Sequence, residues 1–296
     1  MKRAGEFELI NAFLGQLPHP RPPRGPGDDC AVLPPARAHV CVTTDALVEH
    51  VHFTRPSFSL GDIGHKALAV NLSDLAAMGA RPTWWLCALG LPRTFTRAHV
   101  LALARGMAPL AKQHKLSLLG GNITGSPVLT LSLTLAGEAR RPMLRSGARP
   151  GDLLFVSGLL GSAAAGRFLR VPALVAAQRR PAPQVKLGLT AARWASAAID
   201  VSDGLLADLG HLCAASGVGA DLDSHALPLH PAVRRSARGL QWALTGGEDY
   251  QLLLAVPARH RARFAALSCI GTIRAGRGLS LDGQRVSPKG FDHFRR

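Results

Sequence analysis

Acidic residues are scarce in this sequence. Only 19 of its 296 residues are Asp or Glu, against 35 Lys and Arg, which gives a formal net charge of +16. Aromatic residues are few, with a single Tyr, so we expect an aliphatic core. The five cysteines are scattered without a C-x-x-C pair, which argues against a zinc site and a disulfide framework and suits a reducing cytosol.

Long apolar runs and several common motifs are also missing. No segment reaches the roughly 20 apolar residues of a membrane-spanning helix, and Met1–Glu8 contains no apolar signal-peptide core. We therefore expect a cytoplasmic protein with no membrane partner. The sequence has no G-x-x-x-x-G-K-[ST], G-x-G-x-x-G, H-E-x-x-H or G-x-S-x-G motif. Their absence disfavours a P-loop kinase, a Rossmann dehydrogenase, a metalloprotease and an α/β-hydrolase.

The positive charge is spread along the whole chain. Arg forms only short runs, such as Arg140-Arg141 and Arg234-Arg235, whereas a nucleic-acid binder usually gathers Lys and Arg on one stripe or tail. We therefore expect an Arg-rich protein without a nucleic-acid partner. Its positive field still favours an anionic small substrate.

Many of the few acids fall in five short stretches, which we call the acid segments. Clustered carboxylates repel one another, so a cation is expected to offset them, and oxygen ligands from Asp, Asn and Thr suit Mg²⁺. One such stretch alone is an ordinary turn or helix cap, but five in an acid-poor chain favour a metal-binding set. The acid segments are Gly27–Asp29, Thr43–Asp45, Asn71–Asp74, Asp200–Gly204 and Gly246–Asp249.

Glycine-rich turns offer the chemistry that phosphate groups need. Gly120–Gly121 and Gly158–Gly161 can present backbone N–H groups to phosphate oxygens. The first turn continues into Asn122, an amide where an acid would complete the pattern. Glu49–His52 is a weaker metal candidate, because two alternating His at a strand end are more often structural or substrate-facing.

Periodicity predicts a mixed α/β chain in two domains. The Pro- and Gly-rich segment Arg140–Gly151 is the expected boundary, with an N-terminal domain at residues 1–140 and a C-terminal domain at 141–296. Between elements, Pro172–Pro183 is expected to be a surface excursion. The predicted strands are Ala38–Thr44, Trp84–Leu91, Val128–Glu138, Asp152–Ser157 and Tyr250–Val256, and the predicted helices are Asp62–Met78, Phe95–His114, Ala163–Arg170, Thr190–Ala198 and Asp203–Ser216.

The acid segments also match a known family. Nearly the full length of the chain resembles the thiamine-monophosphate kinase family, which belongs to the superfamily of aminoimidazole ribonucleotide synthetase. The specific match is Asn71–Ala80, inside the longer matching block Lys66–Pro82, together with Gly246–Tyr250. Further matching stretches are Gly5–Ile10, Gly27–Asp29, Thr43–Asp45, His50–Phe53, Arg145–Ala148, Pro150–Asp152, Ala198–Leu205, Ser216–Ala220 and Gly290–Phe294.

The resemblance implies a fold and an activity. The activity is ATP-dependent phosphorylation of thiamine monophosphate to thiamine diphosphate, by in-line transfer assisted by several Mg²⁺ ions. The fold is the two-domain α/β fold of aminoimidazole ribonucleotide synthetase, with mixed sheets. The N-terminal domain would bind ATP and Mg²⁺, and its sheet would form a barrel in a homodimer. The C-terminal domain would close the active-site cleft.

Matched by motif, the resemblance also implies roles for single residues. The implied metal ligands are Asp28, Asp29, Thr43, Thr44, Asp45, Asp74, Asn122, Asp200 and Asp203. The residues implied along the ATP phosphates are Gly121, Asn122, Arg145 and Ser202, with Arg145 as the catalytic cation that stabilises the transferring charge. His52, Glu248 and Phe291 would contact the thiamine substrate.

One position departs from the family pattern. The family usually has Asp where this chain has Asn122, and an amide oxygen can bind Mg²⁺ but brings no charge. We therefore predict a raised Mg²⁺ requirement with the chemistry retained. Two alternatives stay open. One is a related ATP-dependent synthetase, although the reactive Cys and Lys of selenophosphate synthetases are not found before Asp28. The other is a protein that binds nucleotide or thiamine phosphate without turnover.

Overall fold

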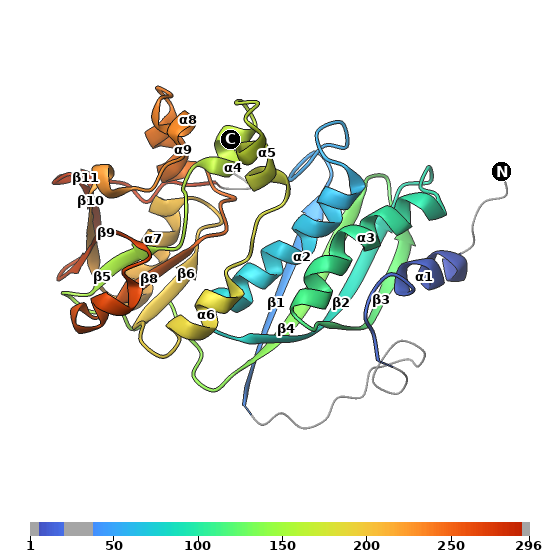
Figure 1. Ribbon diagram of the computed structural model, residues 1–296, viewed down its shortest axis with the longest axis horizontal. Coiled ribbons are helices and arrows are strands. Elements are labelled where there is room, and N and C mark those ends of the chain that lie inside the picture. The colour runs from blue at the N-terminus through green and yellow to red at the C-terminus, as the bar shows by residue number, and fades with distance from the viewer. Residues whose placement is uncertain (1–5, 21–37, 292–296) are drawn as a thin grey trace. The chain divides into compact units, whose positions relative to one another are not determined.

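The computed structural model describes residues 6–20 and 38–291 and divides the chain into two compact units (Figure 1). Unit 1 runs to Leu75 and continues over Arg81–Arg140, and unit 2 holds Ala76–Ala80 and the chain from Arg141 onward. Each unit contains one mixed β-sheet with helices. This arrangement is the two-domain α/β class that the sequence predicts.

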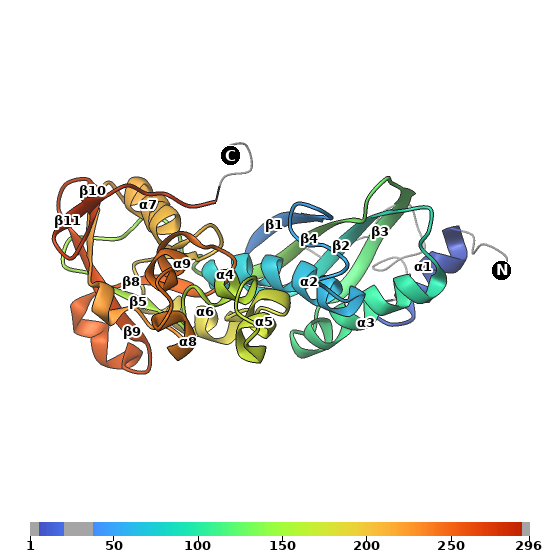
Figure 2. The same ribbon diagram turned by 90° about the horizontal axis from the view of Figure 1, so that it is seen from above.

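Unit 1 is built on a four-stranded sheet in the order β1-β4-β2-β3. The β1–β4 and β4–β2 pairs are antiparallel, and the β2–β3 pair is parallel. Figure 2 shows α2 and α3 side by side along one face of this sheet. The elements are α1 (Glu6–Leu14), β1 (His39–Val48), α2 (Leu60–Ala77), β2 (Arg81–Leu91), α3 (Arg97–Gln113), β3 (Ser117–Gly125) and β4 (Thr130–Ala139).

The two faces of the unit 1 sheet differ in burial. Alternate leucines of β4, from Leu131 to Leu135, are fully buried, as a strand with one face on a core requires. The other face carries Val40, Val42 and Leu86, which are 46%, 59% and 38% exposed. Among the described residues no helix lies over this second face (Figure 2), so it presents apolar side chains to the outside.

Unit 2 is built on a seven-stranded sheet in the order β11-β10-β7-β9-β5-β8-β6. Its pairs are antiparallel except β7–β10, which is parallel. The elements are β5 (Leu153–Val156), α4 (Ser162–Gly166), α5 (Pro172–Arg179), α6 (Val185–Ala191), β6 (Ala197–Asp200), α7 (Leu205–Ser216), β7 (Gly219–Leu222), η1 (Ser224–Ala226), α8 (Pro231–Arg234), α9 (Gly239–Thr245), β8 (Leu252–Val256), η2 (Ala258–Phe264), β9 (Ser268–Arg274), β10 (Gly278–Leu281) and β11 (Gln284–Val286).

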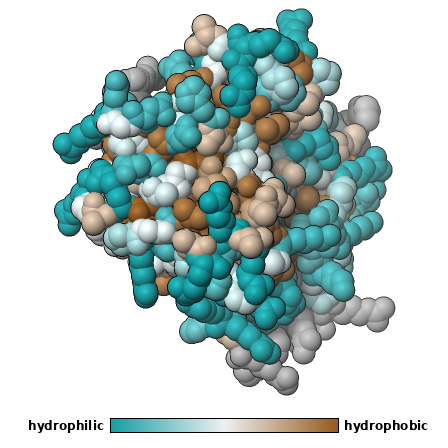
Figure 3. All heavy atoms as spheres, turned by 60° about the vertical axis from the view of Figure 1, so that its left-hand side comes forward, coloured by the Kyte–Doolittle hydropathy of each residue, from teal (hydrophilic) through white to brown (hydrophobic). Residues whose placement is uncertain are grey.

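The main core of unit 2 lies between α7 and the sheet. Leu205, Leu209 and Leu212 recur on one side of α7 at helical spacing and are fully buried in a cluster with β6 and β8. A smaller cluster surrounds Trp242 and joins α4, α5, α8 and α9. Figure 3 shows hydrophilic side chains around the outline of one face of the molecule, with apolar patches toward its middle. Across the described ranges, no helix combines the length and apolarity needed to cross a membrane.

One local expectation is wrong. Thr190–Ala198 is not one helix, because α6 ends at Ala191 and the chain enters β6 at Ala197. A short apolar run fits a buried strand as well as a helix, and pairing with β8 decides the outcome. The expected surface excursion contains α5, which starts at Pro172, where the missing N–H of proline is tolerated.

Candidate functional site

In unit 1, two acid segments meet between β1 and α2. The hydroxyl of Thr43 donates a hydrogen bond to the Asp74 carboxylate, so these residues from two elements lie side by side. Asp45 is two residues further along β1 and therefore points to the same side of the strand as Thr43. One turn before Asp74, the buried Asn71 side chain leaves its Oδ1 without a hydrogen-bond partner. This corner gathers several hard oxygen atoms.

Thr44, Gly121 and Asn122 lie elsewhere in unit 1. Thr44 alternates to the uncovered face, where its hydroxyl donates to the Leu133 carbonyl at 3.1 Å. Asn122 is on β3, three strand spacings from β1, or about 14 Å across the sheet. Gly121 touches the β2 backbone so closely that a Cβ there would lie 2.0 Å from the Cys87 carbonyl oxygen. Of these three residues, Thr44 is therefore the one that stays next to Asp45, and it does so through its main chain.

His52 lies in the turn that follows β1. Its Nδ1 accepts a hydrogen bond from the Val48 N–H at 3.0 Å. Beside it, buried Glu49 accepts from Arg55 Nε at 2.5 Å and from the Leu129 N–H at 3.1 Å. Burial opposes ionisation of Glu49, but these bonds outweigh it and lower its pKa. Glu49 is thus occupied by structural partners, which supports the non-metal interpretation of Glu49–His52.

In unit 2, two further acid segments pair along their backbones. The first runs from Asp200, buried at the end of β6, to Gly204 at the start of α7. The Glu248 N–H donates to the Ser202 carbonyl at 2.7 Å, and the Tyr250 N–H donates to the Val201 carbonyl at 2.8 Å. The structure therefore brings Asp200, Ser202, Asp203 and Glu248 into one neighbourhood.

Asp208 organises the first of these segments, and the sequence analysis did not assign it a role. Its Oδ2 accepts the N–H groups of Ser202, Asp203 and Gly204 at 3.0, 3.1 and 3.1 Å. Gly204 adopts a φ of +117°, which favours glycine. Burial, and next the nearby Asp203 charge, raise the pKa of Asp208 to about 7. The available signal was an acid inside the predicted helix Asp203–Ser216, which falls in the first turn of α7.

Asp249 is a second organising acid that the sequence analysis left without a role. Its two oxygens accept the N–H groups of Gly161 at 2.6 Å and Ala163 at 3.0 Å, at the start of α4. Burial raises its pKa to about 7. The bond fixes the turn Gly158–Gly161 to the Gly246–Asp249 segment. The two partners are 88 residues apart in sequence, so no local pattern could reveal the contact.

The proposed substrate residues Glu248 and Phe291 both adjoin Asp203. Glu248 has a left-handed backbone, with φ of +62°, and its carboxylate forms an ion pair with Arg167. The Phe291 N–H donates to the Asp203 carbonyl at 2.9 Å, and the Phe291 side chain is half exposed. An acid and an exposed ring therefore flank the same loop, an arrangement suited to a small ligand with polar and aromatic parts.

Arg145 lies at the other end of α7. Its carbonyl accepts a hydrogen bond from Ser216, the last residue of that helix, at 2.8 Å. Ser202 stands before the first residue, and a helix of 12 residues is about 18 Å long. Within unit 2, the main chain of Arg145 is therefore not next to Ser202, and the catalytic role of Arg145 stays a prediction.

The donor set suits a hard divalent cation. Carboxylate and hydroxyl oxygens of Thr43, Asp45 and Asp74, and the acids Asp200 and Asp203, are the ligand types that Mg²⁺ prefers. The unpartnered Oδ1 of Asn71 adds a further oxygen beside Asp74. Within residues 6–20 and 38–291 no three His, Cys, Asp or Glu side chains form a metal-sized group. Asp28 and Asp29, predicted as ligands, lie outside the described residues.

Comparisons with known proteins cover nearly the whole chain. Residues 27–139 match the AIR synthase related protein, N-terminal domain, and residues 149–269 match the AIR synthase related protein, C-terminal domain. The thiamine-monophosphate kinase of Salmonella typhimurium is 39% identical over 322 aligned residues, with 98% of each chain covered.

Solved structures agree with these matches. The thiamine-monophosphate kinase of Stenotrophomonas maltophilia K279a superposes with a TM-score of 0.84 at 37% identity, covering 95% of this chain and 96% of that one. AaThiL complexed with AMPPCP and TMP superposes with a TM-score of 0.83 at 35% identity, covering 99% of both chains. The similarity in sequence and in structure thus extends over both units.

Proposed function

The chain belongs to the thiamine-monophosphate kinase family, and from this premise we propose that it transfers the γ-phosphoryl group of ATP to thiamine monophosphate. The products are thiamine diphosphate and ADP. The observation that carries the proposal is the family match over 98% of the chain. A relative with 35% identity, AaThiL, was solved with the ATP analogue AMPPCP and TMP, which supports both substrates.

The proposed reaction needs positioning and charge neutralisation rather than a protein nucleophile. An oxygen of the acceptor phosphate attacks the γ-phosphorus, while the bond from that phosphorus to the β–γ bridging oxygen breaks and ADP leaves. We assign the alignment of the ATP phosphates to Gly121, Asn122, Arg145 and Ser202. Arg145 is the proposed cation for the charge that develops on the transferred group.

Mg²⁺ is the proposed metal, and it supplies neutralisation of the polyphosphate charge. We assign its binding to the oxygens of Asp28, Asp29, Thr43, Thr44, Asp45, Asp74, Asn122, Asp200 and Asp203. The contact between Thr43 and Asp74 supports the unit 1 part of this set. The three N–H groups held by Asp208 support the unit 2 part, because they fix the main chain of Ser202 and Asp203.

Asn122 gives a direct test of the metal assignment. Since the amide brings no charge, the Asn122→Asp variant should reach half-maximal activity at a lower Mg²⁺ concentration, on the order of 3- to 10-fold. Initial rates over a Mg²⁺ titration at saturating ATP measure this shift. An unchanged metal dependence would remove Asn122 from the proposed ligand set.

For the acceptor substrate we assign His52, Glu248 and Phe291. Glu248 can accept hydrogen bonds from an aminopyrimidine, and the exposed Phe291 ring offers a stacking surface. The ion pair with Arg167 and the bond from the Glu248 N–H to the Ser202 carbonyl keep this residue beside the loop that contains Asp203. Reaction with two soluble metabolites also agrees with a cytoplasmic location.

We further propose a homodimer in which the uncovered faces of two unit 1 sheets pack together as a barrel. Val42 and Leu86 are 59% and 38% exposed on this face, and exposed apolar patches of this kind mark interfaces. Burial of this face in a partner would remove the apolar surface from water. Residues 1–140 would then serve ATP binding, Mg²⁺ binding and dimerisation, and residues 141–296 would complete the site.

A single-turnover assay tests the function and separates it from binding without turnover. Excess protein is mixed with ATP, Mg²⁺ and thiamine monophosphate, and thiamine diphosphate is measured by chromatography. Stoichiometric product supports the kinase. Bound but unchanged thiamine monophosphate would instead support a binding protein, and consumption of a different acceptor would support a related synthetase.

A further inference from the structure

Unit 2 contains a pocket that is distant from the unit 2 acid segment Asp200–Gly204. It lies where β5 and β6 begin and β8 ends, whereas Asp200 and Gly158 stand at the opposite ends of β6 and β5 (Figure 1). Its volume is about 750 Å³, within the range of small-molecule sites. The walls come from three parts of the chain, which are residues 141–152 without Arg145 and Ala148, residues 192–196 and residues 257–260. We call it the arginine pocket.

Positive charge dominates this pocket. Arg141, Arg149, Arg193 and Arg259 line it and are exposed. Among the described residues, no carboxylate forms an ion pair with any of these four side chains. Four like charges around one hollow repel one another, so an anion bound there is favoured by all four.

The single carboxylate in the wall does not neutralise them. Asp152 is buried and accepts the Arg149 N–H at 2.9 Å and the Ser196 hydroxyl at 2.5 Å. Both bonds join parts of the pocket wall to one another and leave the charges of the guanidinium groups uncompensated. His260 adds a further donor beside Trp194, whose ring centroid lies 5.1 Å from that of His260.

A fifth cation stands at the same wall. The guanidinium of Arg263 lies 3.8 Å from the centroid of a Trp194 ring. This stacking helps to fix the orientation of the Trp194 ring that lines the pocket. The arginine pocket therefore combines several planar donors with an aromatic wall. Guanidinium groups bind phosphate oxygens in pairs, and several arranged around one space suit more than one phosphate.

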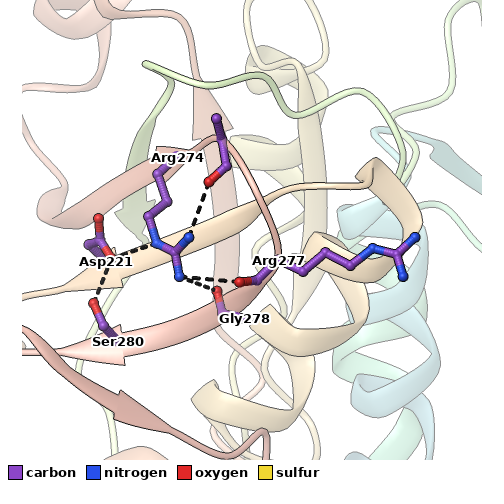
Figure 4. Close-up of polar contacts among 6 residues, drawn as sticks. Asp221, Arg274, Arg277, Gly278 and Ser280 are labelled. Carbon is purple, nitrogen blue, oxygen red and sulfur yellow. Dashed lines mark hydrogen bonds and ion pairs between the residues drawn. The ribbon is translucent and has the colours of Figure 1, made fainter.

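A different charged pocket of unit 2, around Arg274, does not offer uncompensated guanidinium groups in the same way. There Arg274 donates to Asp221 at 2.9 Å and to the carbonyls of Arg277 and Gly278 at 3.3 and 3.2 Å (Figure 4). Ser280 also donates to Asp221, at 2.5 Å. The Arg274 cation is therefore satisfied by the fold. In Figure 4 the Arg277 side chain extends away from this cluster, which makes it a suitable control.

We propose that the arginine pocket binds an oligophosphate anion, with two or more linked phosphates, at a site separate from the acid segments of unit 2. The chemistry is shared by inorganic triphosphate and by nucleoside di- and triphosphates. Arg149 and Arg259 reach the space from different walls, so they bind the anion from two sides.

The experiment titrates inorganic triphosphate into the full-length protein by calorimetry, with EDTA present. Without divalent metal the acid segments repel the anion, so binding reports on the arginine pocket. We expect saturable binding with one site per chain. The double variant Arg149→Ala/Arg259→Ala should bind at least about 10-fold more weakly, whereas Arg277→Ala should stay within about twofold.

Further arms identify the ligand and guard against trivial explanations. Far-UV circular dichroism checks that the exposed substitutions leave the fold intact. If ATP in EDTA binds more tightly than triphosphate, and the double variant weakens both, the ligand is a nucleotide and the proposal is supported. No saturable binding, equal weakening by Arg277→Ala, or displacement mainly by a long oligonucleotide would each overturn it. Kinase activity of the double variant is measured separately, so failure of this site leaves the proposed function untouched.

Discussion

Asp208 should stabilise the conformation of the Ser202–Gly204 loop more strongly than any other side chain in unit 2. It is 2% exposed and accepts three backbone N–H groups. Asp208→Ala leaves the three N–H donors without a partner. The Gly204 N–H is buried, whereas the Ser202 and Asp203 N–H groups are partly buried and can reach some water. At about 1–3 kcal/mol for each buried orphan, and less for the others, we expect a loss of about 3–5 kcal/mol.

The matched variant is Asp208→Asn, which keeps an oxygen for the three donors and removes only the charge. Because burial raises the pKa of Asp208 to about 7, the charge contributes little near neutral pH, and we expect a loss below about 1.5 kcal/mol. Asp223→Ala, which removes one exposed acceptor for the His225 N–H, should lose under about 1 kcal/mol.

Urea unfolding followed by circular dichroism gives these free energies, and turnover is measured in parallel. Displacement of Ser202 and Asp203 by about 1 Å should lower kcat about 100-fold in Asp208→Ala. Equal urea midpoints for the Ala and Asn variants would refute the reasoning, because the three hydrogen bonds would then not stabilise the loop.

Three further perturbations follow from the structure. Gly121→Ala places a Cβ 2.0 Å from the Cys87 carbonyl oxygen and should lower the free energy of unfolding, measured with urea, by about 2–4 kcal/mol. The control Gly125→Ala, on the same strand, meets nothing within 4 Å and should be nearly neutral. Equal urea midpoints for the two variants would contradict this. Burial raises the pKa of Asp249 to about 7, so the folded state keeps a proton that the unfolded chain releases above pH ~4, and the stability from this group falls as pH rises from about 4 to about 7, by up to about 4 kcal/mol. The difference in free energy of unfolding between wild type and Asp249→Asn should therefore change by up to about 4 kcal/mol between pH 4 and pH 8. The same difference at both pH values would exclude a raised pKa of Asp249. Val42→Lys should shift the protein from dimer to monomer in analytical ultracentrifugation, while Val51→Lys, 54% exposed in the turn after β1, should not; two dimeric variants would argue against the barrel.

Much of the fold could be predicted because it follows from local periodicity. The helical spacing within Asp62–Met78 corresponds to α2, and the alternation in Val128–Glu138 corresponds to β4. The helix predicted for residues 190–198 is wrong because Ala197–Ile199 suits either a helix or a strand. The partner strand β8 lies more than 50 positions away in sequence. Local pattern carries no information about such a partner.

The candidate site divides in the same way. The acids at the end of β6 and the start of α7 were recognisable from composition, and the structure brings Asp200, Ser202 and Glu248 together. Asp208 and Asp249 were not recognised, because each acts on the backbone of another segment. Thr44 illustrates the limit of a motif, since strand alternation turns its hydroxyl to the Leu133 carbonyl and away from Thr43.

The most direct test of the central claim follows the phosphoryl group itself. Purified protein is incubated with γ-labelled ATP, Mg²⁺ and thiamine monophosphate, beside the Asp203→Asn variant, and the labelled product is identified. The account predicts label in the terminal phosphate of thiamine diphosphate, with equimolar ADP, and a rate at least about 100-fold lower in the variant. Label released only as inorganic phosphate, or transferred equally well by Asp203→Asn, would contradict it.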